Sequence, residues 1–135
     1  ERRAFVTSAL AVIAGFDPAP PPPGQPREPQ RLAADPAVRP FLTPDQRRGL
    51  ETPPSSKLVM FRLDTALASV RALHAGGVEI LAGSDAPNPG TAHGASLHHE
   101  LELLVRAGLT PVEALRAATS APARRFGLAD RGRIA

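Results

Sequence analysis

The sequence predicts an α/β fold built on parallel strands, and two observations lead to this prediction. A helical pattern stops at Gly76-Gly77, and an apolar run from Val78 to Gly83 follows at once, broken only by Glu79. Strands buried on both faces of a parallel sheet read as such continuous apolar runs, and helices connect them. The length of 135 residues and the 42% hydrophobic content suffice for the core of one ordinary domain.

The first expected element is a strand within residues 1–16. Phe5 to Gly15 is short, apolar and partly β-branched, and it ends on a glycine, which favours a buried strand. The letters SALAVIA in the same run are also compatible with a helix, so a helix is the alternative.

Residues 17–54 are expected to form a Pro-rich loop or insertion. This stretch holds twelve of the sixteen prolines, and each proline removes a backbone donor and fixes φ. Short helical turns are expected around Leu32 and after Thr43, where Thr43 can cap a helix that has Pro44 at its first position.

Residues 55–128 are expected to supply a helix, a strand and further helices. Ser55 or Ser56 can cap a helix that runs to about Ala75, where the Gly-Gly pair ends it. The apolar face of this helix repeats at Leu63, Leu67, Val70 and His74.

Three helices are expected after the strand. The first has an apolar stripe of Leu97, Leu101, Leu104 and Val105 and ends at Gly108. The next opens with a full capping box, in which Thr110 is the N-cap and Glu113 is the third helical residue. A short helix around Pro122 to Phe126 is expected last.

Composition excludes several kinds of site and partner. The chain has no Cys, which excludes disulfides, thiolate zinc sites and cysteine nucleophiles. The net charge of +3 comes from dispersed arginines without aromatic stacking residues, so we expect no nucleic-acid partner. No apolar segment reaches the roughly 20 residues that span a bilayer, so we expect no membrane partner. The lack of Cys and of a signal peptide fits a cytoplasmic location, although zero Cys is also tolerated elsewhere.

Asp85, in the stretch ILAGSDAPNPG, is the residue that points to chemistry. Functional groups of parallel α/β folds gather at the C-terminal ends of strands, and Asp85 occupies such an end. A carboxylate there can bind a metal or act as a general acid or base. The alternative is an Asx turn that introduces the loop, and the pattern alone leaves both interpretations open.

The histidines do not complete a site with Asp85. His74 lies near a helix C-terminus, where an imidazole is commonly a cap. His98 and His99 are adjacent on a helix and point about 100° apart, so they are poor joint ligands of one metal. His93 and Asn88, in the loop after Asp85, are the candidate substrate-binding residues. A solvent-facing loop position is the alternative for His93.

The order of features from Leu67 to Ala135 is distinctive. A strand leads to Gly-Ser-Asp and a Gly-bearing loop, and LHHELELLVRAGLTPVEALRAAT, PA, FGL and GRI follow. This order resembles the C-terminal part of metal-dependent amidohydrolases, in particular their imidazolonepropionase-like and prolidase-like branch. The resemblance implies a C-terminal fragment of a (β/α)₈ TIM-like barrel. In it, residues 1–16 are the penultimate strand, Asp85 ends the last strand, and residues 129–135 begin the return to a small β-domain.

The resemblance also implies a reaction. The parent enzyme would hydrolyse C–N bonds of cyclic amides or small amide-containing substrates. Asp85 would ligate a divalent metal, zinc or alternatively manganese or iron, and carry the proton of the hydrolytic water to the leaving nitrogen. The His-x-His pair of the family has no counterpart here. We therefore expect the missing N-terminal part of the same enzyme as partner, and an isolated chain that is inactive and marginally stable.

The sequence also allows an alternative function. The chain could be a non-catalytic half-barrel that uses its polyproline run as a docking segment for SH3-type partners.

Overall fold

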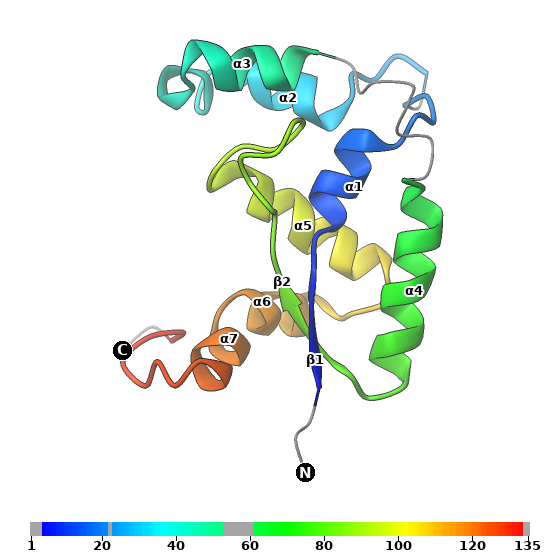
Figure 1. The fold of residues 1–135 in the computed structure, drawn as a ribbon, viewed down its shortest axis with the longest axis vertical. Coiled ribbons are helices and arrows are strands. Elements are labelled where there is room, and N and C mark those ends of the chain that lie inside the picture. The colour runs from blue at the N-terminus through cyan, green and yellow to red at the C-terminus, as the bar shows by residue number, and fades with distance from the viewer. Residues whose placement is uncertain (1–3, 22, 53–60, 134–135) are drawn as a thin grey trace.

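A two-stranded parallel sheet lies at the centre of the computed structural model, which describes residues 4–21, 23–52 and 61–133 (Figure 1). Strand β1 (Phe5–Ser8) pairs with β2 (Glu79–Ala82), and their registers run from Phe5 opposite Glu79 to Ser8 opposite Ala82. The α/β prediction with parallel strands is confirmed. The described residues are mostly helical, and they do not include a closed barrel.

The strand predicted within residues 1–16 is wrong beyond Ser8, because helix α1 (Leu10–Phe16) follows β1 directly. The helical alternative for these letters is the correct one. The backbone N–H of Ala11 donates to the Glu100 carboxyl group over 2.7 Å, which satisfies a donor that the first turn of a helix leaves unpaired. Leu10 and Val12 are buried in the resulting turns.

The Pro-rich insertion is more helical than the predicted loop. It contains α2 (Glu28–Ala34), the 3-10 helix η1 (Arg39–Phe41) and α3 (Pro44–Glu51). Pro29 and Pro44 lie in the first turns of α2 and α3, where a helix does not need the missing N–H. The predicted Thr43 cap is confirmed, since its Oγ1 accepts from Gln46 N over 3.2 Å.

The insertion packs onto the loop that follows β2, at the end of the molecule toward which both strands run (Figure 1). Their shared core consists of Leu32, Ala33, Leu50 and Ala92. Gly15 in α1 also approaches Gly90 in this loop so closely that a Cβ on Gly90 would lie 3.1 Å from the Gly15 Cα atom. The insertion, α1 and the loop after β2 therefore form one packed unit.

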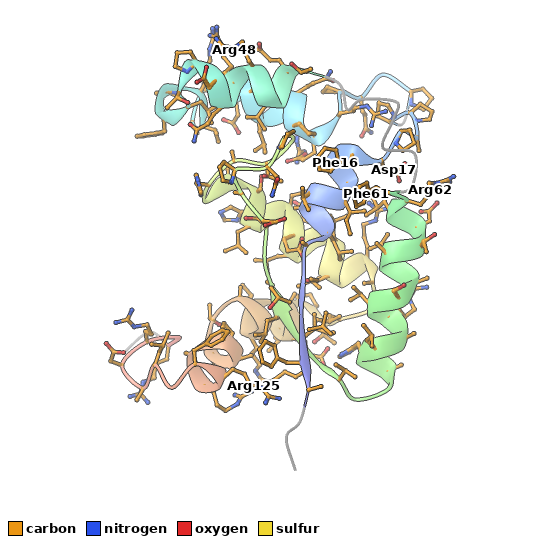
Figure 2. The ribbon with its side chains drawn as sticks, in the orientation of Figure 1. Phe16, Asp17, Arg48, Phe61, Arg62 and Arg125 are labelled. Carbon is orange, nitrogen blue, oxygen red and sulfur yellow. The ribbon has the colours of Figure 1, made fainter. Side chains whose placement is uncertain are left out.

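The junction between α1 and α4 (Leu63–Ala75) is built around Asp17 (Figure 2). The Asp17 carboxylate accepts from Leu63 N over 2.7 Å and from Ala19 N over 2.8 Å. Burial raises the pKa of Asp17, but these hydrogen bonds and the charges of Arg62 and Arg27 outweigh burial and hold that pKa below its usual value.

Helix α4 ends at Ala75, as predicted, and Leu67 and Val70 on its predicted face are buried. The predicted caps Ser55 and Ser56 lie outside the described residues. No helix in the described ranges has both the length and the apolar character needed to cross a bilayer.

Helix α5 (Ala95–Arg106) buries only part of the predicted stripe, of which Leu104 is fully buried. Val105 is 40% exposed, and Leu97 and Leu101 are only half-buried. The buried positions are Ser96, Glu100, Leu103 and Leu104. On this buried face Glu100 bonds to Ser8 and Ala11 of the neighbouring β1–α1 segment.

Helices α6 (Pro111–Ala118) and α7 (Ser120–Arg125) complete the described fold. The predicted capping box is confirmed, since Thr110 Oγ1 accepts from Glu113 N over 3.2 Å and Thr110 N donates to the Glu113 carboxylate over 2.7 Å. Together with α1, α4, α5 and β2, α6 encloses the main core, which consists of Leu10, Leu67, Val70, Ile80, Leu103, Leu104, Ala107, Leu109, Ala114 and Ala117. The predicted return to a β-domain at residues 129–135 stays a prediction.

Candidate functional site

The candidate site lies just beyond the C-terminal end of β2. Gly83 follows the strand directly, and a Cβ atom there would lie 2.7 Å from the Thr7 methyl group and 3.1 Å from the Ser8 carbonyl oxygen. The chain thus passes so close to the end of β1 that only glycine fits without a shift. This tight passage places Ser84 and Asp85 at the edge where both strands end.

Asp85 adopts an uncommon backbone conformation. Its φ is 51°, in the left-handed region, which Asp tolerates better than most residues. Its carbonyl oxygen accepts from Asn88 N over 3.2 Å and from Asn88 Nδ2 over 2.8 Å, so the turn is closed by the main-chain carbonyl group. An Asx turn would use the carboxylate as acceptor. No donor among the described residues bonds to the Asp85 carboxylate, and the side chain is exposed.

Asn88 and His93 have different positions in the loop. Asn88 lies in the same turn as Asp85. Its own carbonyl oxygen accepts from Thr91 N over 2.9 Å and from Thr91 Oγ1 over 2.8 Å. His93 lies farther along and borders a cavity of about 270 Å³ that is lined mainly by residues of the insertion. The other lining residues are Ala37, Val38, Phe41, Leu42, Gln46 and Ala95.

Two of the three remaining histidines lie near a carboxylate. His74 Nε2 lies 3.9 Å from the Glu113 carboxylate, and His99 Nδ1 lies 3.4 Å from the Glu102 carboxylate. His98 is exposed.

A protein metal site commonly needs three or more side-chain ligands. Across residues 4–21, 23–52 and 61–133, no three His, Asp or Glu side chains come together in this way. The described residues by themselves therefore do not fit a complete metal centre. Asp85 offers a single carboxylate ligand.

Glu100 is a buried ionisable residue that the sequence interpretation did not select. Its side chain is 0% exposed, and it lies 2.5 Å from Ser8 Oγ and 2.7 Å from Ala11 N. Burial raises the pKa of Glu100, and this outweighs the opposing effect of the bonds from Ser8 and Ala11. Glu100 lies four residues after Ser96 and four before Leu104, on the apolar side of α5. A Glu at this spacing among apolar positions is the sequence signal that could have identified it.

A larger hollow, of about 810 Å³, lies at the opposite end of the sheet, where the strands begin. Its polar lining is already paired, since Arg124 and Arg125 of α7 both contact the Glu79 carboxylate (Figure 2 labels Arg125). The bond from Arg125 lowers the pKa of Glu79, and Arg125 also stacks over the Phe5 ring at 5.4 Å. These contacts attach α7 to the start of the sheet. They also pair Glu79 with Arg124 and Arg125, the charged groups that a ligand in this hollow would contact.

Comparisons with known proteins give one family and one structure. A family model described as "Amidohydrolase family" matches residues 52–135. Among solved structures, the chain is similar to a bottromycin amidohydrolase, with 26% sequence identity and a TM-score of 0.64. That similarity covers 96% of this chain and 30% of the other, so the chain spans less than a third of that structure. No curated protein matches the sequence.

Proposed function

Because the chain belongs to the amidohydrolase family, we propose that it contributes the Asp85 edge of the active site of a hydrolase that cleaves amide C–N bonds. The resemblance to the imidazolonepropionase-like and prolidase-like branch supports cyclic amides or small amide-containing molecules as substrates. The proposal includes a (β/α)₈ barrel in which β1 and β2 are the last two strands. Because the chain spans 30% of the similar structure, the other strands and ligands would belong to a longer enzyme.

The observation that carries this proposal is the carboxylate of Asp85. It lies past the C-terminal end of a parallel strand, where α/β enzymes place their reacting groups, and no described donor bonds to it. Such a carboxylate can take a proton from the attacking water while the water oxygen bonds to the amide carbon. It can then deliver that proton to the nitrogen as the C–N bond breaks.

Metal binding is the second part of the proposal. Family membership supports a divalent metal, zinc or alternatively manganese or iron, with Asp85 as one ligand. The other ligands would have to come from outside the described residues, since no three His, Asp or Glu side chains of those residues come together.

Asn88 and His93 are proposed to contact the substrate. Asn88 shares a turn with Asp85, and His93 borders the cavity of about 270 Å³ beneath the insertion. Its apolar lining, including Val38 and Leu42, would suit an apolar group of the substrate.

The test compares Asp85→Asn with Asp130→Asn in the full-length protein. Asp130 is a matched control because it is an exposed Asp in a loop and pairs with the adjacent Arg131. Loss of a positioned acid–base group is expected to lower kcat about 10²–10⁴-fold on a panel of small cyclic amides. The bound metal content should fall in Asp85→Asn alone. Activity and metal content equal to those of Asp130→Asn would contradict the proposal.

The docking-module alternative has less support. It would need a polyproline segment with accessible carbonyl groups, whereas the Arg27 guanidinium bonds to the carbonyl oxygens of Asp17, Pro18 and Ala19 over 2.7, 3.2 and 2.8 Å. This end of the Pro-rich stretch is folded back onto the start of α2.

A further inference from the structure

We infer that Glu100 is a positioning residue that acts as a neutral carboxylic acid and joins α5 to the C-terminal ends of both strands. Nothing in the proposed reaction uses this residue, and its protonation state does not depend on the substrate. Only its effect on hydrolysis rests on the proposed function.

The hydrogen bonds around Ser8 require a proton on Glu100. Ser8 Oγ lies 2.5 Å from Glu100 Oε1 and 3.2 Å from the carbonyl oxygen of Leu81 in β2. The Leu81 carbonyl can only accept, and the Ser8 hydroxyl has one hydrogen to donate. An ionised Glu100 could also only accept, so one of the two contacts would lack a hydrogen. A proton on Oε1 supplies both, because Glu100 donates to Ser8 and Ser8 donates to Leu81.

The other carboxyl oxygen of Glu100, Oε2, also has a partner that suits a protonated group. Glu100 Oε2 accepts from Ala11 N over 2.7 Å, at the first turn of α1. A protonated carboxyl group keeps this acceptor while its other oxygen donates. No buried side-chain nitrogen or oxygen in the described part of the chain is then without a partner.

The surroundings of Glu100 disfavour a negative charge on its carboxyl group. Glu100 is 0% exposed and Ser8 is 5% exposed, so ionisation would leave a negative charge away from water. The elements that hold its partners, β1 and α1, contain no ionisable side chain. Among the ionisable groups of the described residues, His99 on α5 lowers the pKa of Glu100. This effect is smaller than the increase caused by burial. No Lys or Arg of the described residues bonds to the Glu100 carboxyl group, so an ionised Glu100 would lack a charged partner there.

Glu100 therefore stabilises the edge of the sheet at which Asp85 lies. Ser8 is the register partner of Ala82, and Gly83 and Ser84 are all that separate Ala82 from Asp85. By linking Ser8, Leu81 and Ala11, Glu100 holds the ends of β1 and β2 and the start of α1 in one arrangement.

The test begins with the protonation state in the full-length protein. Infrared difference spectra between the unaltered protein and Glu100→Gln are expected to show the carbonyl band of a protonated carboxyl group at neutral pH. The matched control is Glu102→Gln, an exposed Glu on the same helix, which should leave that band unchanged. A Glu100 that is ionised at neutral pH would overturn the inference.

Hydrolysis then tests positioning. Glutamine can donate to Ser8 and accept from Ala11, so Glu100→Gln should fold and keep its kcat, whereas Glu100→Ala should lose about 100-fold in kcat through misplacement of the edge. A Glu100→Gln variant as impaired as Glu100→Ala would also overturn the inference. If the carboxyl band is present and Asp85→Asn has no effect on hydrolysis, the proposed function fails and the assignment of Glu100 stands.

Discussion

Replacing Asp17 with Asn should lower the free energy of unfolding by an amount that the structure allows us to work out. Asp17 is 8% exposed, and its two carboxylate oxygens accept separate N–H groups, one from Ala19 and one from Leu63. The Leu63 N–H is the first helical donor of α4, so this bond joins the end of α1 to the start of α4.

An asparagine side chain has one oxygen, so only one of the two N–H groups keeps an acceptor. The other N–H faces an amide NH₂ group and is left unpaired in a partly buried position, which costs about 1–3 kcal/mol. The surviving bond loses its charge, and since bonds to charged groups contribute about 1.5–3 kcal/mol against roughly 1 for neutral ones, about 1 kcal/mol more is lost. The expected change is therefore about 2–4 kcal/mol.

Urea denaturation of Asp17→Asn measures this change, and Asp64→Asn is its matched control. Asp64 lies in the first turn of the same helix but is exposed, so its loss should cost about 0.3–1 kcal/mol through the helix dipole alone. Amide exchange at Leu63 should quicken in Asp17→Asn and stay unchanged in Asp64→Asn. Equal denaturation midpoints for the two variants would refute the reasoning.

The pH dependence of Asp17 has a definite sign. Its pKa is lowered in the folded state, so its contribution is fully present above the ordinary pKa of about 3.9 for Asp. As pH falls below that value, the unfolded chain binds a proton before the folded chain does. Stability is then lost by at most about 1.4 kcal/mol per pH unit, until the pH passes the folded pKa. Asp17→Asn should lack this component of the acid transition.

Three further predictions concern the core, the passage beside β1 and the buried Glu. Leu104→Ala should cost about 2.7–5 kcal/mol because Leu104 is 0% exposed, whereas Leu115→Ala, at 56% exposure, should change stability by about 0.5 kcal/mol or less in the same denaturation assay. Gly83→Ala should destabilise through its contact with the Thr7 methyl group, and Thr7→Ser should relieve part of that cost in a double-mutant cycle. Because the folded pKa of Glu100 is raised, the stability of the unaltered protein relative to Glu100→Gln should be greatest below about pH 4.3 and should decline as pH rises through the folded pKa. A difference that grew with pH would contradict the last of these.

Features whose partners lie close in the chain could be predicted from the sequence. The Thr43 and Thr110 caps each depend on a residue three positions later, and both are present. The position of Asp85 could also be predicted, because a Gly-terminated helix followed by an apolar run identifies the strand whose end it follows.

Features that depend on distant partners could not. Residues 10–16 are equally apolar as strand or helix, and the helix has a buried donor satisfied by Glu100, which is 89 residues away from Ala11 in the chain. The same bond gives a partner to Glu100 on the buried side of α5, alongside Leu103 and Leu104, where a charged residue is not expected from hydrophobicity. The short helical turns expected around Leu32 and after Thr43 are present as α2 and α3, and Pro29 and Pro44 are tolerated because each falls in a first helical turn.

The pairing of β1 with β2 has a kinetic consequence. Ser8 bonds to a carbonyl group 73 residues later, and the whole insertion lies within the intervening chain. Closing so long a loop is slow, and the strand contact should therefore form after the local helices, with a φ-value near zero for mutations at Ser8. The equilibrium is far less sensitive, since each doubling of loop length costs only about 0.6 kcal/mol. A substantially longer insertion should thus delay strand pairing while leaving it almost as stable as before.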